Sequence, residues 1–214
     1  MKITKLGHCC LLIEENGTRI LTDPGSYTDA QNNLKDIDIV LITHEHSDHF
    51  HIESVKKILE NNPGVSIITN MSVDMLLKKD NIDFGRVVAH GDSLLEKGIN
   101  FSGFGHTHAL IHKEWPVVEN TGYFIADKLF YPGDAFYNPE KSVEILALPV
   151  SGPWMKISEA IDYAIEINPK KVFGVHDGML NNFGGGVIKR VPTQILEKHG
   201  INFINLELGK EYEF

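Results

Sequence analysis

Cysteine is scarce in this chain, and its two copies stand side by side as Cys9 and Cys10. Adjacent residues of an extended strand point to opposite faces of a sheet, so we expect two buried, reduced thiols rather than a disulfide. Long apolar runs are also lacking. No stretch approaches the roughly 20 apolar residues of a membrane helix, and residues 1–15 lack the order of a signal peptide. These absences predict a cytoplasmic protein that makes no contact with a membrane.

Basic residues are few as well. The 20 Lys and Arg stand against 29 Asp and Glu, which gives a formal net charge of −9. Binding to nucleic acid depends on Lys and Arg that neutralise phosphates, so this balance argues against a nucleic-acid partner. The length of 214 residues and the 42% hydrophobic content predict one domain over residues 1–214. The sequence leaves open whether the chain forms a homo-oligomer.

Short apolar strands alternate with turns and helices along the chain. An antiparallel meander is predicted over 2–6, 9–14 and 18–22, with Asn16 and Gly17 as a hairpin turn. Further strands are predicted at 37–43, 65–69, 86–90, 99–104, 121–126, 128–131, 144–149, 171–175 and 202–206. The strand-loop-helix order recurs in both halves, which predicts an α/β fold of two sheets packed together with helices outside.

Fewer helices than strands are expected. Ser47 or Asp48 is predicted to cap a helix that carries Ile52, Val55 and Ile58 on one face. Other helices are predicted at 71–79, 157–167 and 192–199. The glycine-rich run 181–186 lacks the ending of a phosphate-binding loop and is predicted to form a loop that borders the site.

Histidine, in contrast, is plentiful and clustered. Of 11 histidines, four fall within 44–51 and three within 106–112. The apolar run 37–43 continues directly into HEHSDH, which places these side chains at the C-terminal end of a strand. Imidazole nitrogens and a carboxylate in one short loop are the ligand types of zinc and its first-row neighbours. We therefore expect one ion at His44 and His46, and another at Asp48 and His49.

The pattern H-x-H-x-D-H in this loop resembles the metallo-β-lactamase fold superfamily. The resemblance extends from GHCCLLIEENGTRILTDPG near the start to VHDGML near the end, so it covers nearly the whole chain. It implies a four-layer αββα sandwich with the site at one sheet edge. It also implies a later histidine, an aspartate after a strand and a final histidine, which the chain supplies in this order as His106 or His108, Asp134 and His176.

Spacing does not identify the later histidine, because His106, His108 and His112 are separated by even numbers and would share one face of an extended strand. The segment GHTHALIHKEWPVVENTGYFI is similar to the branch that contains lactonases of the L-ascorbate 6-phosphate type. In that branch the ligand stands immediately before Ala. The resemblance therefore implies His108 as the ligand, with His106 as the alternative and His112 as a pocket residue.

Several neighbours of these ligands are candidates for supporting roles. Asp134 could bridge two ions and Asp48 could steer the nucleophile, so both are candidate catalytic residues. A metal-bound histidine needs an acceptor for its other ring nitrogen, and Asp23 is the candidate, unless it caps the turn that follows it. His8 lies near the site by resemblance. Lys156 could hold a substrate phosphate or carboxylate, or could be a surface lysine beside a helix start.

The donor set favours one or two Zn²⁺ ions, although Mn²⁺, Fe²⁺ and Ni²⁺ accept similar donors. Zinc lowers the pKa of bound water from about 16 to about 7, so we expect a hydrolase that needs no dedicated side-chain base. The branch resemblance implies a small-molecule substrate, a lactone or a sugar-phosphate lactone. The alternatives are a phosphodiesterase or nuclease of the same fold and a metal-binding protein without turnover. Neither cysteine is expected near a ligand position, which argues against a β-lactamase.

Overall fold

Two mixed β-sheets form the centre of the molecule in the computed structural model, which describes residues 1–83 and 85–214. The described strands of the first sheet are, in spatial order, β14 (Glu211–Glu213), β1 (Lys2–Gly7), β2 (Cys10–Glu15), β3 (Thr18–Thr22), β4 (Ile39–Leu41), β5 (Ser66–Thr69) and β6 (Gly85–Val87). Those of the second sheet are β13 (Asn202–Ile204), β12 (Lys171–Val175), β11 (Ile145–Pro149), β10 (Leu129–Tyr131), β9 (Gly122–Ile125), β8 (Ile99–Phe104) and β7 (Ser93–Glu96).

The two sheets repeat one topology. In the first, β1, β2 and β3 are antiparallel and β3, β4, β5 and β6 are parallel. In the second, β8, β9 and β10 are antiparallel and β10, β11, β12 and β13 are parallel. The predicted hairpin turn is confirmed, with φ of 52° at Asn16 and 81° at Gly17. Because parallel strands end at the same edge of a sheet, the loops that follow β3, β4, β10 and β12 come together there.

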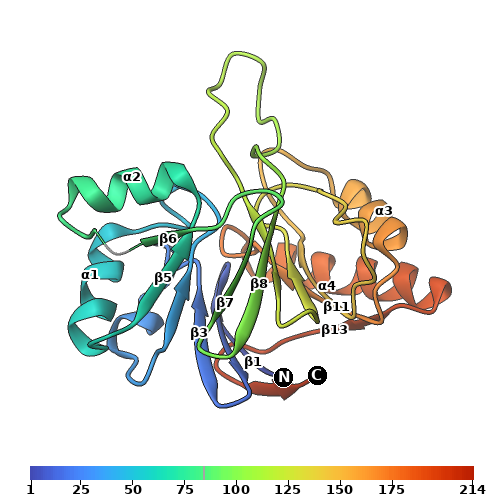
Figure 1. Cartoon of the computed structure of the whole chain (residues 1–214). Coiled ribbons are helices and arrows are strands. Elements are labelled where there is room, and N and C mark those ends of the chain that lie inside the picture. Colours follow the sequence, from blue (N-terminus) through green and yellow to red (C-terminus); the bar gives the residue numbers. More distant parts are fainter. Residues whose placement is uncertain (84) are drawn as a thin grey trace.

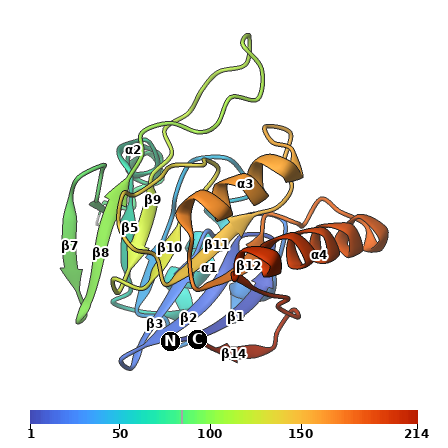
Figure 2. The same ribbon diagram turned by 90° about the vertical axis from the view of Figure 1, so that its right-hand side faces the viewer.

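Helices cover the outer face of each sheet (Figures 1 and 2). The helices α1 (Ile52–Asn61) and α2 (Met71–Lys79) lie on the first sheet, and α3 (Ile157–Ile167) and α4 (Asn182–Leu196) lie on the second. Two 3₁₀ turns, η1 (Ala30–Asn33) and η2 (Glu197–His199), complete the helical segments among the described residues. None of these helices combines the length and the apolar character that crossing a bilayer requires.

Apolar side chains fill the space between the layers. The inner core joins the two sheets and contains fully buried Phe101, Tyr123 and Phe173. One outer core packs Val55 and Ile58 of α1 against the first sheet, and another packs α3 and α4 against the second. This order of helix, sheet, sheet and helix is the predicted αββα sandwich.

The last helix differs from the prediction. It begins at Asn182 instead of residue 192, and it contains the glycine-rich run that was expected to form a loop. The side chain of Asn181 accepts hydrogen bonds from the N–H groups of Phe183 and Gly184, so the first turn is capped. Ile188 and Leu196 bury an apolar stripe against the second sheet. Capping and packing outweigh the low helix propensity of glycine.

Other boundaries also differ. The helix α1 has His51 as its N-cap instead of Ser47 or Asp48, because the preceding loop is drawn into the site described below. β6 ends at Val87. The strands β7 and β14 were missed because their sequences, SLLE and EYE, are short and largely polar. β14 pairs with β1 and brings the two termini together (Figure 1).

Truncating one side chain of the inner core tests the packing of the sheets. Phe173 is fully buried in β12, and we expect Phe173→Ala to lower the free energy of unfolding by about 3–5 kcal/mol. Leu95→Ala is the matched control, because Leu95 is 72% exposed in β7 and should change stability by less than about 0.5 kcal/mol. Chemical denaturation measures both, and equal losses would contradict this account of the core.

Candidate metal centre

Histidine and aspartate side chains from several loops converge at the C-terminal edge of the parallel strands. The loop after β4 supplies four of them, and loops after β1, β3, β8, β10 and β12 supply one each. The residues that the structure brings together are His8, Asp23, His44, His46, Asp48, His49, His108, Asp134 and His176. All but His46 and Asp48 are buried.

The loop after β4 is held by hydrogen bonds from both sides. The carbonyl of Thr43 accepts hydrogen bonds from the Asn70 side chain at 2.9 Å and from the Thr121 N–H at 3.0 Å. Gly25 packs directly beneath the loop, where a Cβ atom would lie 1.8 Å from the carbonyl oxygen of Asp48. A side chain at residue 25 would therefore displace the loop that carries the histidines.

Three histidines form the first ligand group. His44, His46 and His108 each place a ring nitrogen within 4.8 Å of the others, and His44 Nε2 lies 3.2 Å from His46 Nδ1. Burial lowers the pKa of His44 well below its ordinary value, and burial together with nearby His108 lowers that of His46. Both rings are therefore neutral near pH 7, so their lone pairs are available to a metal ion.

Asp134 lies between this group and the next. Its Oδ1 is 3.2 Å from His49 Nε2, and its Oδ2 is 2.9 Å from His176 Nε2 and 3.2 Å from His108 Nε2. Trp154 Nε1 donates a hydrogen bond to Oδ2 at 2.9 Å. Burial would raise the pKa of Asp134, but the positive charges of His49 and His176 hold it well below its ordinary range. A buried, ionised carboxylate therefore separates the two sets of rings.

Asp48 faces Asp134 across the cluster and is partly accessible, with 17% of its side chain exposed. Its Oδ2 lies 3.0 Å from His8 Nε2, 3.5 Å from His176 Nε2 and 3.8 Å from His49 Nε2. Burial would raise its pKa, but the nearby His176 ring and the hydrogen bond from His8 hold the pKa below its ordinary value. Asp48 is therefore an ionised group at the mouth of the cluster.

The residues fit a metal ion. Among the described residues, His49 Nε2, His176 Nε2 and Asp134 Oδ1 are buried and make no hydrogen bond of good geometry, although Asp134 lies within 3.2 Å of both nitrogens. Burial lowers the pKa of His176, yet its contacts with the ionised carboxylates of Asp134 and Asp48 raise it to about 10. The cluster therefore favours an added positive charge, and nitrogen and carboxylate oxygen are the donors that zinc prefers.

Most of the rings are fixed through their second nitrogen. His49 Nδ1 donates to Asp23 Oδ2 at 2.7 Å, and both side chains are fully buried. His176 Nδ1 pairs with the Ser151 carbonyl, and His108 Nδ1 lies 2.5 Å from the Ala109 carbonyl. Such contacts select the tautomer that presents Nε2 to a metal. The turn after Asp23 is closed by backbone atoms, so its side chain is free to orient His49.

The structure separates the three histidines of the loop after β8. The strand ends at Phe104, and the chain then leaves the sheet in a projecting segment (Figure 2), so the expected shared strand face does not exist. His108 is buried in the cluster. His106 is exposed and packs against His90, with ring centroids 4.4 Å apart, and His112, predicted as a pocket residue, is also exposed and lies outside the cluster.

Lys156 is exposed at the N-cap of α3, where its N–H donates to Glu159, which is the position of a surface lysine beside a helix start. One further expectation needs correction. Cys9, which was not expected near a ligand, places its sulfur within 4.8 Å of ring nitrogens of His8, His49 and His176. Both cysteines are buried and free, as predicted. Strand alternation could place Cys9 on the inner face, but could not show what it meets there.

A two-sheet sandwich with outer helices and a histidine and aspartate cluster at its strand ends defines a protein of the metallo-β-lactamase fold. Residues 2–176 match the family model of the beta-lactamase superfamily domain. The chain therefore belongs to this superfamily, as the H-x-H-x-D-H pattern predicted.

Relatives span nearly the full length of the chain. Protein Rv0786c of Mycobacterium tuberculosis is 35% identical, over 84% of this chain and 85% of its own. A UPF0173 metal-dependent hydrolase of Nanoarchaeum equitans is 26% identical over 100% of both chains. Igni18, a metallo hydrolase from Ignicoccus hospitalis, superimposes with a TM-score of 0.76 at 20% identity, over 100% of this chain and 98% of its own. That superposition confirms the predicted fold.

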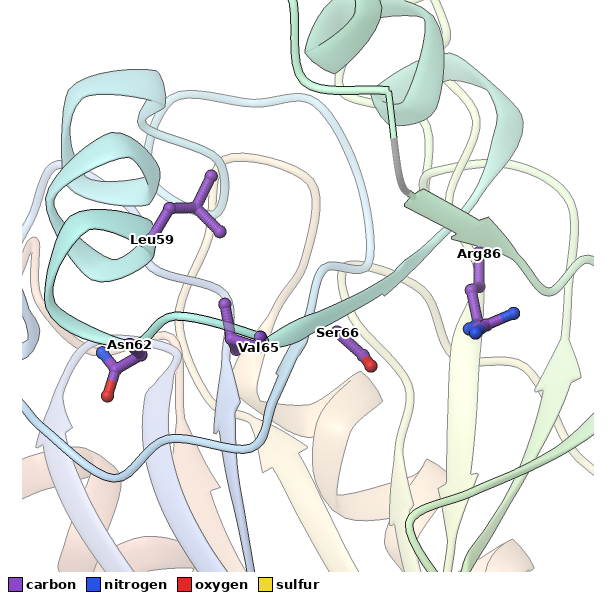
Figure 3. Close-up of a pocket in the computed structure, with 6 residues that line it drawn as sticks. Leu59, Asn62, Val65, Ser66 and Arg86 are labelled. Carbon is purple, nitrogen blue, oxygen red and sulfur yellow. The ribbon is translucent and has the colours of Figure 1, made fainter.

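A separate cavity of about 560 Å³ lies away from the cluster, at the N-terminal end of β5 (Figure 3). Leu59 of α1, Ser66 of β5 and Arg86 of β6 contribute to its lining. Arg86 Nε is paired with Glu96 at 3.2 Å, and Ser66 Oγ donates to Glu96 at 2.6 Å. Arg86 and Ser66 thus both contact Glu96, and the cavity lies at the opposite end of β5 from the histidines.

The choice between the two nearby histidines can be tested by metal binding. We expect His108→Ala to weaken the binding of one metal ion by at least about tenfold, because a buried nitrogen donor is lost. His106→Ala is the control, and its exposed ring should be dispensable. Chelator competition measures both affinities. A loss in His106→Ala with normal binding in His108→Ala would reverse the assignment.

The role of Asp23 is a second test. We expect Asp23→Asn to weaken metal binding by about 10- to 100-fold, since the neutral amide no longer holds His49 Nδ1 with a full charge. Asp83→Asn, at a side chain that is 81% exposed, is the control for the loss of one negative charge. The same competition assay applies, and unchanged affinity in Asp23→Asn would show that the Asp23 side chain serves only to hold Thr43 and Tyr131.

Proposed function

We propose that this protein is a metal-dependent hydrolase that binds two zinc ions and cleaves a small ester-like substrate, with a lactone or sugar-phosphate lactone favoured. The convergence of His44, His46, His108, Asp48, His49, Asp134 and His176 around unpartnered buried nitrogen and oxygen atoms carries the proposal. The names of the relatives from Nanoarchaeum equitans and Ignicoccus hospitalis support the reaction class.

The proposed ligands divide into two sets. His44, His46 and His108 would hold one ion, and Asp48, His49 and His176 the other, with Asp134 between them. Zinc, when bound, supplies Lewis acidity and lowers the pKa of a bound water to about 7.

Asp48 is placed to orient a water molecule and to hold its proton. It is the most accessible carboxylate of the cluster, and a hydrogen bond to His8 fixes its position. His8 accepts a hydrogen bond from the Gly178 N–H on Nδ1 at 3.0 Å, so its Nε2 carries the proton and donates to Asp48. His8 is therefore a positioning residue, and Asp48 is the proposed catalytic residue that acts on the nucleophile.

A cavity beside His8 supports a small substrate. It has a volume of about 520 Å³, within the range of small-molecule sites, and Tyr27, Asn181 and Lys189 contribute to its lining. Lys5, at the same cavity, is paired with Asp177 at 2.7 Å, which leaves Lys189 as the cation to meet an anionic substrate group. This arrangement supports a phosphorylated or carboxylated substrate over a neutral one.

The proposal is tested by assaying metal-loaded protein against lactones, sugar-phosphate lactones and phosphodiesters. We expect lactone hydrolysis that is lost on chelation and restored by zinc. Asp48→Asn should lower kcat by at least about 100-fold, the usual contribution of a proton-transfer group. Glu45→Gln, from the same loop but outside the cluster, is the control and should retain full activity.

Each alternative has its own outcome. Cleavage of phosphodiesters without cleavage of lactones would replace the proposed substrate class with that of a phosphodiesterase. Two bound ions with no turnover of any substrate would favour a metal-binding protein. A protein that binds no metal after reconstitution would overturn the proposed function itself.

A further inference from the structure

Cys9 lies in the turn between β1 and β2, directly after His8. His8 has a φ of 50°, in the left-handed region, and this tight turn presents both residues to the inner space between the sheets. The Cys9 carbonyl accepts hydrogen bonds from Thr22 Oγ1 at 2.9 Å and from the Tyr131 hydroxyl at 2.8 Å. The backbone at Cys9 is thus fixed by groups from both sheets, and its side chain is 2% exposed.

The Cys9 sulfur is surrounded by potential metal ligands. It forms a group with one ring nitrogen each of His8, His49 and His176, and all four atoms lie within 4.8 Å of one another. Zinc binds sulfur at about 2.3 Å and nitrogen at about 2.1 Å, so a sulfur and a nitrogen on one ion lie at most about 4.4 Å apart. The tetrahedral geometry that zinc prefers brings a sulfur and a nitrogen to about 3.6 Å, so the side chains would approach the ion by up to about 1 Å on binding.

The hydrogen bonds of the three histidine rings indicate which of them could share a metal ion with this sulfur. Both nitrogens of His8 are engaged, by Gly178 and Asp48. His49 and His176 use Nδ1 for Asp23 and Ser151, and their Nε2 atoms are buried without a hydrogen-bond partner among the described residues. The thiol itself makes no hydrogen bond to any described residue. His49 and His176 therefore each bring a ring nitrogen into the same buried space as the Cys9 sulfur.

We propose that the Cys9 thiolate is a ligand of the metal ion held by His49 and His176. The inference rests on the metal centre of the proposed function and adds a sulfur donor to it. As the sulfur–metal bond forms, the S–H bond breaks and the proton leaves to solvent, so binding at this position releases one proton.

A thiolate at this position favours particular metals. Sulfur is a soft donor that suits zinc, whereas manganese prefers carboxylate, carbonyl and water oxygens. The Cys9 ligand therefore makes this half of the centre selective for zinc over manganese. The other half, with His44, His46 and His108, offers no sulfur and does not share that selectivity.

Cys10 is the matched control because it is the neighbouring residue and equally buried. Its side chain points to the opposite face of the first sheet, into the core beneath α1 and α2. Burial raises the pKa of the Cys10 thiol well above its ordinary value, so this thiol stays protonated. Any sulfur signal from a bound metal should therefore depend on Cys9 alone.

The test loads the full-length protein with Co²⁺ after chelator treatment, with metal content measured in parallel. We expect a sulfur-to-cobalt charge-transfer band in the wild type and in Cys10→Ser, and no band in Cys9→Ser. Zinc-loaded wild type should also show a sulfur neighbour at about 2.3 Å by X-ray absorption, a readout that needs no variant to fold. Cys9→Ser should bind its second ion at least about tenfold more weakly.

The outcomes separate this inference from the proposed function. Bound metal without a sulfur signal in the wild type would overturn the role of Cys9 and leave the hydrolase proposal intact. A band that persists in Cys9→Ser would also overturn it. A wild-type protein that binds no metal would overturn both.

Discussion

The buried carboxylate of Asp23 connects the two sheets at the candidate centre. It accepts hydrogen bonds from the Thr43 N–H and hydroxyl, each at 2.8 Å, from Tyr131 at 2.8 Å and from His49 at 2.7 Å. Thr43 and His49 belong to the loop after β4, whereas Tyr131 belongs to β10 of the second sheet. A fully buried charge is tolerated only when hydrogen bonds satisfy it, so the position of the histidine loop depends on the packing of one sheet on the other.

The backbone around the centre shows the cost of this arrangement. His8, Asp23 and His176 have φ values of 50°, 36° and 62°, in the left-handed region that residues with a Cβ seldom adopt. Such residues cost about 1–3 kcal/mol each and persist where the surrounding structure determines their conformation. All three carry side chains of the cluster. The fold therefore maintains strained turns where side chains from separate loops must meet.

The charges of the cluster explain why a cation belongs there. Asp48 and Asp134 stay ionised in spite of burial, and the same negative charge raises the pKa of His176 to about 10. Protons and metal ions therefore compete for the same histidine nitrogens in this negatively charged cluster. A bound cation would displace the protons, satisfy the unpartnered nitrogens and link the loops of both sheets, so metal binding and the stability of this edge are coupled.

Local patterns in the sequence determined much of this protein. The apolar run before His44 fixed the strand that ends at the site, and the H-x-H-x-D-H loop with Asp134 and His176 indicated both the superfamily and the donor types. The strand and helix order in two similar halves predicted the sandwich, because the period of apolar residues reports which faces are buried.

Tertiary structure decided what such patterns do not contain. His106 and His108 are equivalent by spacing, and only the departure of the chain from β8 buries one and exposes the other. Capping by Asn181 and packing on the second sheet placed the glycine-rich run in α4. Cys9 met His49 and His176 because the sheets stack face to face. Contacts between residues far apart in the chain depend on how the layers pack, and local patterns in the sequence do not specify that packing.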